Sequence, residues 1–168
     1  MCFNSIENID VLEKVNFKEL KELILNQNKI KDINILDKTD FKHLEILNLN
    51  DNQISDISVF KDVNFRELKK LCLCQNKLQN IDVFGKCHFP KLKYLYLLHN
   101  SISHVDISDE IHFDEVPKFY ITRNSCNGID NIINKIEIVY GYYWLIKDKK
   151  FKFIIIKKLL NYIHNLNI

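Results

Sequence analysis

Residues 20–30 read Leu-Lys-Glu-Leu-Ile-Leu-Asn-Gln-Asn-Lys-Ile, and the same pattern returns four times farther along the chain. The copies occupy residues 44–54, 68–78, 92–102 and, in a degenerate form with Pro117, 116–126. One asparagine recurs in every copy at a spacing of 24 residues: Asn28, Asn52, Asn76, Asn100 and Asn124. A fixed period in this range indicates a stacked repeat array.

Each copy predicts one short strand followed by a tight bend. Successive side chains of a strand face opposite sides, so Leu23 and Leu25 share the inner face, while Ile24 and Asn26 share the outer face. A single turn cannot bury its own apolar face, but stacked turns bury a continuous core. The pattern therefore predicts parallel strands lying side by side, about 4.8 Å apart.

The recurring asparagines are predicted to form a structural ladder. A buried amide must be hydrogen-bonded, and an asparagine side chain offers both donors and an acceptor. We expect each amide to bond the backbone of its own bend and of the next turn.

Other columns keep the same phase. Isoleucine or a similar residue recurs after each asparagine, and one aspartate position, Asp32 and Asp56, is predicted to cap a turn. A phenylalanine column also repeats every 24 residues, at Phe17, Phe41, Phe65, Phe89 and Phe113. These rings are expected to fill the core beneath the convex side.

Over residues 4 to 130 the chain resembles the leucine-rich repeat family. The Asn-x-Ile-x-Asp-Ile run at 28–33 and 52–57 is similar to the subclass of the phosphatase-1 regulatory subunit and the internalins. The resemblance implies an α/β leucine-rich repeat solenoid, with a parallel sheet on the concave side and irregular or 3₁₀ connectors on the convex side.

We expect one domain with two parts. Residues 1–128 form the array: a half repeat at 4–16, then five repeats, the last degenerate. The strand that should precede the half repeat is missing, so we expect either an abrupt start with an open sheet edge or a longer gene product. Residues 129–168 show helical spacing and are predicted to form a helical C-terminal cap, although the β-branched run at 151–156 is also compatible with a strand.

Composition limits the possible partners and compartments. The net charge is +2, too small to indicate nucleic acid binding. Neither a signal peptide nor an apolar run long enough for a membrane span is visible. Five cysteines without paired spacing favour a reducing compartment, so a cytoplasmic or nuclear location is expected.

No catalytic or cofactor motif stands out. Cys72, Cys74 and His99 could meet on the outer face, but a zinc site normally needs four ligands, and Cys-x-Cys on a strand is poor evidence for one. No nucleophile and base are placed to meet, and no phosphate-binding loop is present. We expect no enzymatic activity, no cofactor, no metal and no small-molecule substrate.

The candidate binding site is an aromatic patch on the outer face of the later strands. Tyr94, Tyr96 and Leu98 alternate with core leucines, and Tyr120 lies one period after Tyr96. Exposed aromatic residues in a patch usually indicate a partner. Three basic residues should rim the patch: Lys70, Lys118 and Arg123. The alternative is that these rings only pack across strands or lie under the capping segment.

The resemblance implies a non-catalytic protein-interaction module, an adaptor or regulatory subunit that binds a protein partner on its concave face. A phosphatase regulator and a small intracellular scaffold are both compatible with it. A cell-surface adhesin like the internalins is the main alternative. A nucleic-acid-associated protein that uses the lysines of 147–158 is a further one.

Overall fold

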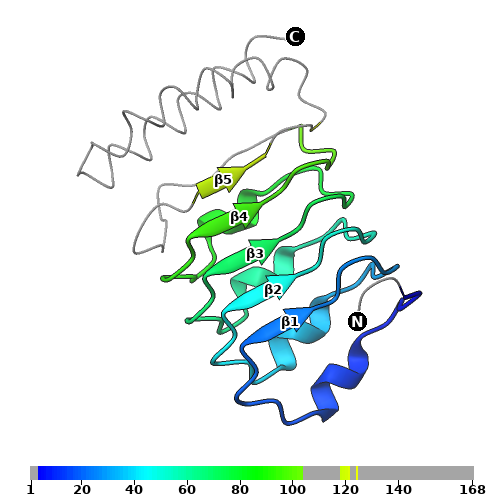
Figure 1. The fold of residues 1–168 in the computed structure, drawn as a ribbon. Helices are drawn as coiled ribbons and strands as arrows, with labels where there is room; N and C mark the ends of the chain where they lie inside the picture. Colours follow the sequence, from blue (N-terminus) through cyan, green and yellow to red (C-terminus); the bar gives the residue numbers. More distant parts are fainter. Residues whose placement is uncertain (1–3, 104–117, 122–123, 125–168) are drawn as a thin grey trace, which may run out of the picture.

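The computed structural model describes residues 4–103, 118–121 and 124, and these form a solenoid built on one parallel sheet (Figure 1). The strands follow one another in chain order without crossovers. They are β1 (Glu22–Ile24), β2 (Ile46–Asn48), β3 (Lys70–Cys72), β4 (Tyr94–Tyr96) and β5 (Lys118–Tyr120). The predicted α/β solenoid is thereby confirmed, whereas the predicted cap at 129–168 lies outside the described residues.

The register of the sheet follows the 24-residue period at every step. Leu23 pairs with Leu47, and Leu47 in turn with Leu71, so each core leucine lies beside its equivalent in the next strand. The outward positions are aligned in the same way, with Tyr96 opposite Tyr120. Residues that share a repeat position therefore form straight columns across the sheet.

The convex side consists of short 3₁₀ helices, as the resemblance implied. They are η1 (Asp10–Lys14), η2 (Asn34–Lys38), η3 (Ser58–Lys61) and η4 (Asp82–Gly85). The carboxylate of Asp32 accepts the N–H of Asn34 at 2.7 Å, and that of Asp56 accepts the N–H of Ser58 at 2.8 Å. Both aspartates thus cap the turn that starts a helix, which confirms their predicted role.

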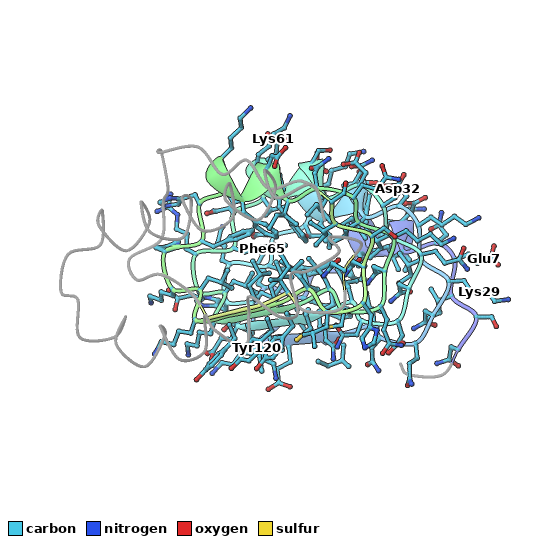
Figure 2. All side chains as sticks on the ribbon, turned by 90° about the horizontal axis from the view of Figure 1, so that it is seen from above. Glu7, Lys29, Asp32, Lys61, Phe65 and Tyr120 are labelled. Atoms are coloured by element: carbon cyan, nitrogen blue, oxygen red, sulfur yellow. The ribbon has the colours of Figure 1, made fainter. Side chains whose placement is uncertain are left out.

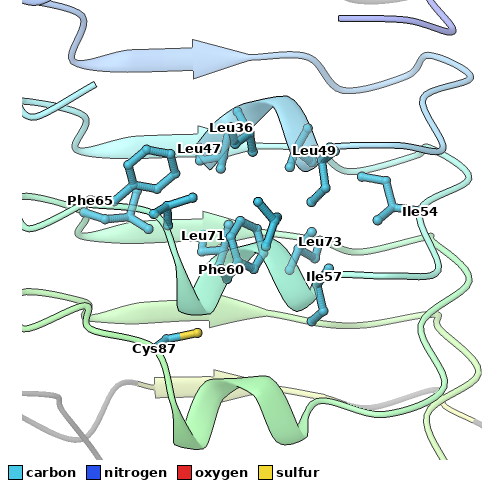
Figure 3. Close-up of a cluster of buried hydrophobic side chains, with 14 of the residues drawn as sticks. Leu36, Leu47, Leu49, Ile54, Ile57, Phe60, Phe65, Leu71, Leu73 and Cys87 are labelled. Carbon is cyan, nitrogen blue, oxygen red and sulfur yellow. The ribbon is translucent and has the colours of Figure 1, made fainter. Parts of the chain in front are cut away.

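The core is a single apolar layer between the sheet and the 3₁₀ helices. In Figure 3, Leu71 and Leu73 lie on the strand side, facing Phe60 of η3. Figure 2 shows Phe65 in the interior, with Lys61 and Tyr120 on opposite outer sides of the molecule. Phenylalanine rings link consecutive repeats, since Phe60 stacks on Phe84 with their centroids 6.2 Å apart.

The phenylalanine column is buried only in part, which corrects the prediction. Phe41, Phe65 and Phe89 are buried, and Phe65 stacks on Phe89 at 6.4 Å. They lie at the turn that leads into each strand. Phe17, however, is 49% exposed, because its turn is the first of this kind in the described chain and no equivalent ring precedes it. Phe113 lies outside the described residues.

The asparagine ladder forms as predicted, except that it bonds the preceding repeat rather than the next one. The Asn76 Nδ2 donates to the carbonyls of Leu73 and Cys74 in its own bend, and to that of Leu49 one repeat earlier. Its Oδ1 accepts the N–H of Ile54, also from the preceding repeat, at 3.0 Å. The same two-way bonding to the preceding repeat recurs at Asn52, Asn100 and Asn124.

The residue before each of the first four asparagines has a left-handed backbone. The φ angles are +58° at Gln27, +54° at Asp51, +55° at Gln75 and +54° at His99. None of these residues is glycine, and a left-handed conformation costs a residue with a Cβ roughly 1–2 kcal/mol. Each ladder amide bonds the carbonyls of the two residues that precede this strained position and so holds the bend.

The half repeat at 4–16 continues the ladder at the start of the array. The N–H of Ile6 donates to Asn28 Oδ1 at 3.1 Å, and the Ile6 carbonyl accepts the N–H of Lys29 at 2.9 Å. Asn4 donates its N–H to the Gln27 carbonyl. The half repeat is therefore bonded to the bend that follows β1, at residues 27–29. No helix in the described residues has the length and apolar character of a membrane span.

Replacing Asn76 with alanine should destabilise the array. The substitution removes the acceptor of the buried Ile54 N–H and one of the two donors to the Leu49 carbonyl, which keeps its bond from Asn52 Nδ2, at a cost on the order of 1–3 kcal/mol. Urea unfolding followed by circular dichroism measures this free energy. The matched control is the exposed Asn64, where alanine should change stability by about 0.5 kcal/mol or less. Equal effects at the two positions would show that the ladder does not stabilise the bends.

The phenylalanine column offers a second matched pair. Phe65→Ala empties a fully buried site and should cost roughly 3–5 kcal/mol, whereas Phe17→Ala should cost about 1 kcal/mol or less, because Phe17 is half exposed. Thermal or urea melts of both variants test the difference. A loss at Phe17 as large as that at Phe65 would mean that Phe17 is covered in solution.

Candidate functional site

The concave face brings three of the predicted site residues into one stack. The rings of Tyr96 and Tyr120 are nearly parallel, with an interplanar angle of 6° and centroids 4.6 Å apart. Tyr94 and Tyr96 are also stacked, at 6.3 Å and 21°. We call Tyr94, Tyr96 and Tyr120 the tyrosine stack. Cross-strand register places Tyr120 beside Tyr96, as the period predicted.

A lysine completes the stack on its other side. Lys70 Nζ lies 5.3 Å from the centroid of the Tyr96 ring, within the range of a cation–π contact. Tyr96 therefore has Lys70 against its ring and Tyr120 stacked on it. The contact of Lys70 was absent from the sequence prediction, which placed this lysine only at the rim, whereas the position of Tyr120 beside Tyr96 was predicted. Packing across strands, the alternative reading of these residues, thus accounts for part of their arrangement.

Of the remaining predicted site residues, the structure describes Leu98 and the backbone of Lys118. Leu98 is half-buried on the same face. The backbone of Lys118 pairs with Tyr94, which puts this residue in the column of Lys70. Arg123 lies outside the described residues.

The hydroxyl group of Tyr96 is a hydrogen-bond donor at neutral pH. Partial burial is the largest cause that raises the pKa of Tyr96 above its usual value, and the neighbouring Tyr120 is the second. Tyr120 is still 38% exposed. The stack therefore offers both exposed aromatic area and the polar hydroxyl groups of its rings, the combination that makes tyrosine effective in interfaces.

The concave side chains of the early strands are largely occupied by the array itself. Asn50 Oδ1 accepts the N–H of Cys74 at 2.7 Å, and Asn48 Oδ1 accepts the N–H of Asn50 at 3.1 Å. The first bond links neighbouring repeats and the second lies within one repeat, and neither was predicted from the sequence. Since both amide oxygens already have partners, Asn48 on β2 and Asn50 just after it stabilise the fold.

Two cysteines lie in the concave columns, and the tertiary structure buries one of them. Cys72 has only 4% of its surface exposed, although its position in the strand faces outward. Burial raises the pKa of its thiol to about 11, and it also raises the pKa of Cys74. Cys72, Cys74 and Cys87 are free thiols, and no cluster of three metal-ligating side chains occurs in the part of the chain that the structure describes.

Two ion pairs join residues one period apart where the chain enters the strands. Lys69 Nζ contacts Glu45, and Lys91 Nζ contacts both carboxylate oxygens of Glu67 at 2.7 Å. The hydrogen bond from Lys69 lowers the pKa of the exposed Glu45. These pairs neutralise two lysines beside the sheet.

Comparison with known proteins agrees with this geometry. A family profile described as leucine rich repeats (2 copies) matches residues 18–62. The chain therefore carries leucine-rich repeats at residues 18–62. Its repeats give a concave parallel sheet with the register described above, and arrays of this family serve as protein-interaction modules.

Solved structures show the same fold. An internalin (inlF) from Listeria monocytogenes is 24% identical over 72% of this chain and 35% of its own, with a TM-score of 0.52. Internalin C2 from the same organism is 23% identical over 68% of this chain and 47% of its own, with a TM-score of 0.54. This repeat protein thus spans between about a third and a half of the length of these structures. No curated protein sequence gives a significant match.

The buried thiols should resist alkylation. At pH 8 a thiol whose pKa is raised from 9.0 to about 11 has about a hundredfold less thiolate than an unperturbed one. In the folded chain, iodoacetamide should therefore modify Cys72 about a hundredfold more slowly than in urea, and the rate should rise as the pH approaches 11. Peptide mass spectrometry after timed quenching separates Cys72 from the other cysteines. Equal rates in the folded and unfolded chain would contradict the burial of Cys72.

Proposed function

We propose that this repeat protein is a non-catalytic adaptor or regulatory subunit that binds a protein partner on its concave face, at the tyrosine stack. The observation that carries the proposal is the contrast between the two halves of that face. On the early strands, asparagine amides bond the array's own backbone. On the later strands, Tyr120 leaves 38% of its surface exposed.

The arrangement of the rings supports a binding role beyond packing. Stacking with Tyr96 and the contact of Lys70 fix the orientation of the rings before any partner arrives. A preorganised aromatic surface loses little side-chain entropy on binding, which favours affinity. Tyrosine is also enriched among residues whose truncation weakens an interface by about 2 kcal/mol or more.

The proposal extends to the compartment and to chemistry. The described cysteines are free thiols, in keeping with a cytoplasmic or nuclear location. Leucine-rich repeat arrays act mainly through binding, so we propose that the chain has no enzymatic activity of its own.

Single substitution of the stack should weaken the complex without unfolding the array. A partner is first captured with the full chain and purified, and its affinity is measured by isothermal titration calorimetry. Tyr94→Ala, Tyr96→Ala and Tyr120→Ala should each keep the circular dichroism spectrum, and at least one should raise Kd by about tenfold or more.

The matched control lies on the same face two strands earlier. Ile46→Ala changes a half-buried side chain in the column of Tyr94 and should leave Kd within about threefold of the wild type. If all three tyrosine variants bind normally while Ile46→Ala abolishes binding, the site is on the early strands and the proposal is wrong.

A further inference from the structure

The surface around the tyrosine stack has two sources of positive electrostatic potential, the edges of the aromatic rings and the neighbouring lysines. An aromatic ring has a negative face and a positive edge. The ring of Tyr96 is stacked on that of Tyr120, and the ammonium group of Lys70 lies over it. The faces of the Tyr96 ring are therefore occupied within the protein. What remains for a partner is the ring edge and the hydroxyl group, and both favour an electron-rich acceptor.

The charged side chains around the stack have the same sign. Glu45 and Glu67 are two carboxylates where the chain enters the strands, and each already pairs with a lysine of the next repeat. Among the described residues, neither Lys70 nor Lys93 forms an ion pair. Lys93 is exposed directly beside Tyr94, and Lys70 lies opposite Tyr94 on β3. Lys70, which contacts the stack, and Lys93, which precedes Tyr94 in the chain, therefore both lack an ion pair with a described carboxylate.

The surface changes character along the strands. After Tyr96 the outward positions become apolar, with half-buried Leu98 and, one strand earlier, half-buried Cys74. From Tyr94 to Leu98 the chain advances four residues, or roughly 13 Å in an extended strand. A ligand lying along the strands would thus meet positive charge at one end and an apolar surface at the other.

We infer that the ligand of this face is an acidic protein segment, with carboxylates over Lys70, Lys93 and the tyrosine edges and an apolar side chain over Leu98. The inference rests on the proposed function, since it names the chemical class of the partner for the same site. The segment binds extended along the strands, with its acidic and apolar residues about four positions apart. Its association rate falls as salt screens the two lysines.

Selection from a random peptide library tests the inference without assuming a partner. Phage-displayed peptides are selected on the full chain, and the enriched sequences should carry a net negative charge with an apolar residue about four positions from the acids. A synthetic peptide from the selection is then measured by fluorescence anisotropy. The double variant Lys70→Glu, Lys93→Glu should raise its Kd by about tenfold or more, and physiological salt should weaken binding relative to low salt.

The control is an equal change of charge away from the site. Lys29→Glu with Lys77→Glu reverses two exposed lysines that follow the bends, outside the strands, and should leave Kd within about threefold. Melting curves confirm that both double variants fold. Lys70→Gln with Lys93→Gln provides a milder version, expected to weaken binding in the same direction.

The outcomes separate this inference from the proposed function. Enriched peptides that are neutral or basic, yet lose binding in Tyr96→Ala or Tyr120→Ala, would overturn the acidic ligand while supporting the concave site. Peptides unaffected by any tyrosine variant would overturn both. If no peptide is enriched, recognition of an extended acidic segment is also contradicted, because such a segment should bind without the rest of its protein.

Discussion

Every turn of this solenoid depends on one buried amide. Asn76 bonds two carbonyls of its own bend and two backbone groups of the preceding repeat, and its equivalents link the other repeats in the same way. The bend needs this support, because the residue before each ladder asparagine from Asn28 to Asn100 has a left-handed backbone without being glycine. The amide compensates a local strain and joins neighbouring repeats through the same set of bonds.

The ladder also determines how the binding surface can vary. With the bends held at a constant spacing, every outward position becomes part of a column, and the side chains of a column touch only their neighbours. Contacts limited to adjacent repeats are typical of solenoids, whose stability is roughly a sum of repeat and interface terms. A column can therefore change from asparagine at position 48 to tyrosine at 96 and 120 while the leucines behind it remain buried.

Packing and recognition are combined in the tyrosine stack. The contacts of Lys70 and Tyr120 with Tyr96 belong to the folded chain, and the same contacts fix the orientation of the Tyr96 ring on the concave face. Rings that serve the fold can still serve a partner, because stacking uses their faces and leaves their edges. The neighbouring Cys72 illustrates the opposite case, a position in an outward column whose side chain is nevertheless buried.

The amino-acid sequence by itself determined the repeat, the inner and outer faces of each strand, and the buried asparagines. Period and alternation are sufficient for this, because a strand places successive side chains on opposite faces whatever their neighbours are. Only the tertiary structure decided which outward residues stay accessible. Cys72 is buried and Phe17 is half exposed, although each shares a column with residues in the other state. The contact of Lys70 with Tyr96 and the bond between Asn50 and the Cys74 N–H depend on side-chain rotamers and on neighbours in the next repeat. A pattern of residue types specifies the column that a side chain occupies, but the atoms around it decide what it contacts.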